Sequence, residues 1–139
     1  MSILASLGPR SFNDDSNVTI DNSWLKRANS KNFHHFFPQS YLEKKGEDYF
    51  FVNHIANITI VDDFLNKRLI RDKAPSKYMK KFLEDNDNLP STMATHLIHD
   101  LDTFGVWAND YEVFFEQRLK AFHREFKKRL KQIQFDKIK

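Results

Sequence analysis

The segment His34-His35-Phe36-Phe37-Pro38-Gln39-Ser40-Tyr41-Leu42 sets the order of the structural elements on both sides of it. The aromatic residues at its start, within 32–37, are typical of a short strand, and Pro38 ends that strand. Because proline suits a first helical position, we expect a helix of about two turns after it, with Gly46 as its stop. Two neighbouring histidines thus lie where a strand gives way to a helix.

A second strand and a second helix follow along the chain. The β-branched residues Ile58, Ile60 and Val61 favour a strand around residues 58–61. Asp62 and Asp63 can cap the next helix. Its buried face would be formed by Phe64, Leu65, Leu69 and Ile70. Residues 32–70 therefore predict strand, loop, strand and helix, which is an α+β arrangement.

The regions on either side of this core have different patterns. Residues 1–30 show little periodicity and are expected to form an irregular lead-in, with a short strand over 17–21 and a helical turn over 23–27. From residue 75 to 139 the pattern is helical. Pro75 and Ser91 begin helices, Gly105 is a break, and Asn109 with Glu112 forms a capping box before the last helix.

Apolar spacing indicates which faces of these helices are buried. The helix after Pro75 would turn Met79, Phe82 and Leu83 inward. The last helix carries apolar residues at positions 111, 114, 115, 119, 122, 126, 130 and 133. We expect this helical region to be an extension of the same domain.

The composition suits a compact domain in water. A chain of 139 residues can bury one core, and 40% hydrophobic with 29% charged residues is ordinary for a globular protein. The 14 Phe residues predict an interior packed with aromatic rings. The net charge of +3 is compatible with a polyanionic partner without requiring one. The sequence contains no apolar run of bilayer length and no signal-like start, so we expect a cytoplasmic protein without a membrane partner.

The absence of cysteine limits the chemistry. Without thiols the chain can form no disulfide, no thiolate zinc site and no cysteine nucleophile. A metal ion would therefore need His, Asn, Asp or Glu as its ligands. The histidine pair is the first candidate for such a site.

At the end of a strand, His34 and His35 can divide two tasks between them. One imidazole can bind a metal ion while its neighbour stays free to take a proton from water. Hydrolysis of a phosphodiester needs a base that works near pH 7 and a cation that neutralises the phosphate. The alternative is a buried or surface pair with no chemistry.

Two asparagines could complete the site. A strand followed by a helix can bring Asn66 back beside the first strand, where its carbonyl oxygen could bind a hard metal ion together with waters. Asn57 lies nine positions earlier, before the second strand. A buried Asn there would fasten a loop through hydrogen bonds to the backbone, and that loop carries the histidines.

These motifs resemble the HNH, or His-Me finger, nuclease family. His34-His35-Phe-Phe-Pro38-Gln39-Ser40-Tyr-Leu42 is similar to the opening of the HNH domain in RNA-guided CRISPR nucleases, and the spacing from Asn57 to Asn66 also fits. The likeness is closer to the C-terminal nuclease domain of GmrSD-type modification-dependent restriction proteins. There His-Ile-Phe-Pro-Gln precedes an Asn-Leu-Thr-Leu-Leu strand, an Asn-containing helix and Lys-x-Pro-Ser, where this chain has Lys73-Ala74-Pro75-Ser76. The resemblance covers roughly residues 30–130.

The resemblance implies a ββα-metal core over residues 31–74 and a role for each site residue. His35 resembles the general base, and Asn57 completes the catalytic set by fixing the loop that carries it. His34 and Asn66 resemble the ligands of one divalent metal ion. The ion is expected to be Mg²⁺. Many relatives have Asp or Glu at the position of His34, and the neutral, softer imidazole here leaves Mn²⁺ or another transition metal as alternatives.

The resemblance also implies partners and a biological setting. The partner would be DNA, whose backbone Lys67, Arg68, Arg71 and Lys73 could contact, although these residues could equally form a solvated charged face. GmrSD-type proteins join the nuclease to an NTPase domain that senses DNA modification and phage infection. A fused or separate NTPase/sensor domain and a role in restriction or phage defence are therefore expected.

Two other interpretations remain open at the level of sequence. The same scaffold could carry a degenerate site and serve as a nucleic-acid-binding or partner-docking domain. A Phe-rich helical interaction domain without a metal site would instead place His34 and His35 far from Asn66.

Overall fold

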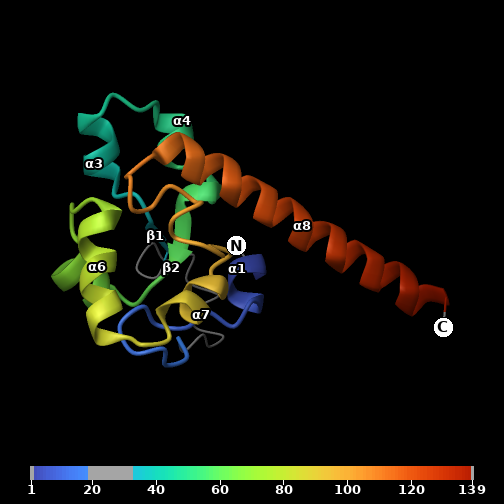
Figure 1. Cartoon of the computed structure of the whole chain (residues 1–139). Helices are drawn as coiled ribbons and strands as arrows, with labels where there is room; N and C mark the ends of the chain where they lie inside the picture. The colour runs from blue at the N-terminus through green and yellow to red at the C-terminus, as the bar shows by residue number, and fades with distance from the viewer. Residues whose placement is uncertain (1, 19–32, 139) are drawn as a thin grey trace.

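The computed structural model describes residues 2–18 and 33–138, and it is an α+β structure in which helices surround a small two-stranded sheet (Figure 1). The elements in chain order are α1 (Ser2–Ser6), β1 (Phe33–His35), α3 (Gln39–Lys44), α4 (Tyr49–Val52), the 3-10 helix η1 (Ile55–Asn57), β2 (Ile58–Ile60), α5 (Asp63–Leu65), the π-helix η2 (Asn66–Ile70), α6 (Pro75–Asp85), α7 (Leu89–Ala94) and α8 (Tyr111–Ile138). The helical turn expected over 23–27 lies outside the described residues, as does most of the strand expected over 17–21.

The two strands pair antiparallel near the centre of the molecule. Phe33 pairs with Ile60, His34 with Thr59 and His35 with Ile58. Behind β1, Pro38 is the N-cap of α3, and Gly46 follows the helix with φ 81°, a conformation that suits glycine. The strand–helix junction expected at the histidine pair is therefore present.

Aromatic rings pack between the sheet and the helices. Phe12, Phe36, Phe37, Phe82 and Phe114 are fully buried. Phe36 and Phe114 stack with ring centroids 4.8 Å apart, which joins β1 to α8. The buried Tyr78 of α6 donates a hydrogen bond to the carbonyl of Phe36, and burial raises the pKa of this tyrosine. The aromatic core thus fixes the backbone that follows the histidines.

The helix after β2 differs from the expected one in its buried face. Leu65 and Ile70 are buried, and Asp62 caps the helix by accepting a hydrogen bond from the amide of Leu65 at 2.8 Å. Phe64, however, is 65% exposed, so its predicted place in the core is wrong. Adjacent helical residues lie about 100° apart, so inward placement of Leu65 turns Phe64 toward solvent.

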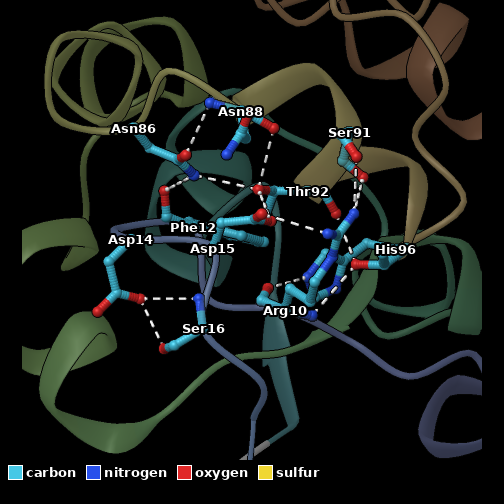
Figure 2. Close-up of polar contacts among 11 residues, drawn as sticks. Arg10, Phe12, Asp14, Asp15, Ser16, Asn86, Asn88, Ser91, Thr92 and His96 are labelled. Atoms are coloured by element: carbon cyan, nitrogen blue, oxygen red, sulfur yellow. Dashed lines mark hydrogen bonds and ion pairs between the residues drawn. The ribbon is translucent and has the colours of Figure 1, made fainter.

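The start of the chain is more ordered than an irregular lead-in. Residues 2–6 form α1, and Leu4 and Phe12 lie in the core. Arg10 forms an isolated bridge with Asn17 and donates to the carbonyl and hydroxyl oxygens of Ser91 at 3.0 and 2.7 Å. Figure 2 shows this segment against α7, and Asn86, which follows α6, donates to the carbonyl of Phe12 at 3.0 Å. Polar contacts distant in sequence hold this segment, and hydrophobic periodicity does not report them.

Within this network, His96 makes folding sensitive to acid. Its Nε2 donates to the carbonyl of Arg10 at 2.7 Å (Figure 2), and burial lowers the pKa of His96 to about 4. In the unfolded chain the imidazole of His96 takes up a proton near pH 6.5, whereas in the folded protein this imidazole stays neutral until about pH 4. The contribution of neutral His96 to the free energy of unfolding is therefore fully present above about pH 6.5. It falls by about 3 kcal/mol as the pH drops toward 4.

Urea unfolding between pH 7.5 and pH 4.5 measures this loss. In His96→Gln the part of the slope due to His96 should disappear, whereas His123→Gln, at an exposed position of α8, should keep it. An unchanged slope in His96→Gln would show that acid sensitivity arises elsewhere.

The region after residue 75 is helical as expected, with different helix starts. Ser91 lies inside α7, whose N-cap is Asn88, and Asp110 rather than Asn109 accepts a hydrogen bond from the first turn of α8. Asn109 instead bonds to Ser76 of α6. In α6 Tyr78 is buried and Leu83 is 46% exposed, so the predicted inward position of Leu83 is wrong.

The last helix does not cap the body along its whole length. Figure 1 shows α8 beginning beside α4 and then extending away from the rest of the molecule. No described helix is sufficiently long and apolar to cross a membrane.

Candidate functional site

A polar pocket of about 340 Å³ opens where β1, α3 and η2 meet. It is lined by His34, His35, Pro38, Gln39, Ser40, Glu43, Asn66 and Arg71. The two histidines come from the end of β1, Asn66 is the first residue of η2, and Arg71 directly follows that helix. The wide separation of the histidines from Asn66, which a helical interaction domain without a metal site would predict, is therefore not observed.

Strand pairing holds the histidine pair at this pocket. His34 is 8% exposed, and its carbonyl accepts a hydrogen bond from the hydroxyl of Thr59 at 3.2 Å. His35 is the last residue of β1 and is half-buried. Beyond it the amide of Phe36 donates to the carbonyl of Asn57 at 2.7 Å. The backbone on both sides of His35 is thus fixed against the second strand.

Asn57 fastens the loop after the histidines with both ends of its amide. Its Oδ1 accepts from the amide of Phe37 at 2.8 Å, while its Nδ2 donates to the carbonyls of Phe37 and Val52, each at 3.0 Å. Because Asn57 is fully buried, it acts on the site through this loop and does not face the pocket. It is a positioning residue.

Asn53 defines which nitrogen of His35 carries the proton. The Nδ2 of Asn53 donates to the carbonyl of Tyr49 at 3.0 Å, which leaves its Oδ1 facing His35 Nε2 at 2.8 Å. Since Oδ1 can only accept, Nε2 must donate, and Nδ1 is then the basic nitrogen of the neutral ring. Sequence reasoning missed Asn53, because nothing in the spacing connects residues 35 and 53.

Asn66 and Arg71 enclose an unusual backbone segment. The amide of Arg71 donates to the carbonyl of Asn66 at 2.8 Å, a bond across five residues that defines the π-helix η2. Arg71 has φ 51° and ψ −123°, a conformation that residues other than glycine rarely adopt. Both π-helical turns and strained residues cluster at functional sites.

The four cations expected to contact DNA differ in whether they line the pocket. Arg71 lines the pocket, whereas Lys67, Arg68 and Lys73 are exposed and are not among its lining residues. They lie within seven positions of chain on η2 and the turn after it. These three residues could contact the backbone of a DNA molecule outside the pocket, without touching the histidines.

Glu43 is a carboxylate at the pocket that the sequence analysis overlooked. It lies on α3 four residues after Gln39, whose side-chain amide donates to it at 2.9 Å. The sequence does carry a signal for it, because Glu43 lies one helical turn into the helix that directly follows the histidine strand. Among residues 2–18 and 33–138 no group of three or more His, Cys, Asp or Glu side chains is placed to hold a metal ion.

Comparisons with known proteins give one partial likeness and no family. A segment of 55 residues, 40% of this chain, is 36% identical to part of an uncharacterized protein of Methanocaldococcus jannaschii. The matched segment is 9% of the length of that archaeal protein, so the match covers a small part of the archaeal protein. No protein family and no solved structure matches the chain.

Proposed function

We propose that this chain is a metal-dependent DNA endonuclease module of the HNH type. The observation that carries the proposal is that His34, His35 and Asn66, from two separate elements, line the same pocket. The order strand, strand, helix and the double fastening of the loop by Asn57 support a ββα-metal core. The reaction is hydrolysis of a phosphodiester bond.

His35 is the general base in this proposal. With Nε2 engaged by Asn53, the Nδ1 of His35 takes a proton from a water molecule as the water oxygen attacks phosphorus. The bond from phosphorus to the 3′ oxygen breaks on the opposite side. Arg71 and the exposed cations near it bind the DNA backbone, which supplies affinity without base recognition.

His34 and Asn66 would hold the divalent ion. One imidazole nitrogen and one amide oxygen leave most of the coordination shell to water, as suits Mg²⁺, and the 340 Å³ pocket has room for those waters. The carboxylate of Glu43 adds the negative charge that the two neutral ligands lack. When bound, the ion neutralises charge on the phosphate and on the leaving oxygen.

The proposed biology is cleavage of foreign DNA in restriction or phage defence, together with a fused or separate NTPase/sensor domain. A second candidate is a nucleic-acid-binding or partner-docking domain on the same scaffold with a degenerate site. The neutrality of His34 and Asn66, which weakens metal binding, favours this second candidate.

Nicking of supercoiled plasmid separates the two functions. We expect the protein to convert supercoiled into open-circular DNA with Mg²⁺ or Mn²⁺, and to lose this activity completely in excess chelator. DNA binding that persists without any nicking in either metal would favour the degenerate domain.

Asn53→Ala should lower the cleavage rate about tenfold and leave KM unchanged, because His35 would lose the partner that sets its tautomer. Asn53→Asp should stay active, and the acid limb of its pH–rate profile should move to higher pH, since a carboxylate stabilises the imidazolium. A purely structural role for Asn53 would leave the pH profile of the aspartate variant unchanged.

A further inference from the structure

We propose that α8 pairs with the α8 of a second copy of this chain, antiparallel, to form a symmetric dimer. This inference stands independently of the nuclease function. It rests on an apolar stripe along α8, an apolar groove beside the start of that helix, and the contrast between the glutamates that line the groove and the basic residues in the second half of the helix.

The stripe lies on one face of α8 and continues beyond the body. It consists of Phe115, Leu119, Phe126, Leu130 and Ile133. Their separations of three, four and seven residues place them on the same side of a helix. Phe126, Leu130 and Ile133 are 49%, 59% and 52% exposed, although the sequence pattern predicts a buried face. A projecting helix with such a face needs an apolar partner.

A groove of about 390 Å³ lies beside the first half of α8. Phe51 of α4 and Phe115 of α8 meet in it with ring centroids 5.4 Å apart, and Leu119 extends it along the helix. Tyr49 and Phe50 are 75% and 64% exposed on α4, the element that lies next to the start of α8 (Figure 1). The groove ends at Leu119, and the exposed stripe resumes on the same face of α8 at Phe126.

The charges around this surface select the occupant. The groove is rimmed by Glu47, Glu112 and Glu116. The second half of α8, residues 125–137, carries five Lys or Arg residues and two acidic residues. A partner for the groove should therefore be an apolar helix with basic flanks, and the second half of α8 is such a helix. A second copy supplies it.

An antiparallel pair satisfies both copies at once. With Phe115 seated between Phe126 and Leu130 of the second copy, Glu112 and Glu116 face Lys131 and Lys127 of that copy. Both pairs of charges are four residues apart, so the spacing matches along the helices. A parallel pair would place Glu112 and Glu116 opposite the same glutamates of the second copy, and Lys127 and Lys131 opposite the same lysines, which disfavours it.

Sedimentation equilibrium of the full chain tests the proposal. Wild type should be a dimer, and Phe126→Glu/Ile133→Glu should be a monomer with unchanged circular dichroism. Phe135→Glu is the matched control, because Phe135 is an exposed Phe at the same end of α8, about 180° around the helix from Phe126. Wild type that is monomeric at all concentrations would overturn the proposal, whether the surface then serves another protein or a lipid surface.

Charge reversal tests the direction of pairing. Glu112→Lys/Glu116→Lys and Lys127→Glu/Lys131→Glu should each weaken self-association roughly tenfold or more. A mixture of the two variants should associate again, because at these four positions each lysine of one variant then meets a glutamate of the other. Failure of the mixture to associate more tightly than either variant alone would overturn the antiparallel arrangement.

Discussion

Replacing His35 with alanine is expected to lower plasmid nicking by roughly 10²- to 10⁴-fold, the contribution that a general base makes to such reactions. The side chain is half-buried at the end of β1 and donates a hydrogen bond to Asn53, so little of the fold depends on it. Single-turnover cleavage of a labelled duplex at saturating Mg²⁺ measures the chemical step directly. The free energy of unfolding should change by less than about 1 kcal/mol.

His123→Ala is the matched control for this loss, because His123 is exposed on α8 and is not among the lining residues of the pocket. Its cleavage rate should equal that of wild type. If His35→Ala cleaves as fast as His123→Ala, the assignment of the base is wrong, even if the activity itself depends on metal.

Replacing Arg118 with methionine is expected to destabilise the fold by about 3 kcal/mol, since it leaves several buried carbonyls without donors. Arg118 is fully buried, and burial lowers the pKa of its guanidinium to about 9, so the group stays charged at neutral pH. It donates to the carbonyl of His96 at 3.0 Å and to those of Ala56 and Ile58 at 3.0 and 2.5 Å. The residue therefore joins α8, the turn after α7, and the start of β2.

Urea unfolding at pH 7.5 measures this loss, with Arg124→Met, at an exposed position of the same helix, as the control. Methionine retains most of the aliphatic volume, so the difference between the two variants reports the hydrogen bonds. Equal stability of both variants would mean that removing a buried charge offsets the lost bonds, which is known for some buried ionic groups. Arg118 would then add no net stability through these hydrogen bonds.

The elements at the centre of the fold could be predicted from the sequence where the signal lies in neighbouring residues. The run from His34 to Leu42 predicts β1 and α3 because proline and the aromatic residues act on neighbouring backbone. The start of α7 could not be predicted in this way, because Asn88 and Ser91 are both residue types that favour an N-cap. Asn88 is the N-cap, and the hydroxyl of Ser91 instead accepts a hydrogen bond from Arg10, a contact between residues far apart in the sequence. The order of α1 likewise depends on contacts far along the chain.

The candidate site could be predicted in part for the same reason. A strand followed by a helix brings Asn66 back to the histidines, so their convergence follows from the order of elements. Asn53 acts across 18 residues, through a helical turn whose direction depends on packing against α8, and no local pattern indicates it. Arg118 does leave a signal, because it falls at helical spacing between Phe114 and Phe122, where an apolar residue is expected.

The convergence of His34 and Asn66 on one ion is the central claim, and a crystal soaked in Mn²⁺ tests it most directly. Anomalous scattering should reveal a manganese ion in the pocket, at about 2.0–2.3 Å from a ring nitrogen of His34 and the amide oxygen of Asn66. Manganese bound elsewhere, or an empty pocket at an ion concentration that supports nicking, would contradict the account.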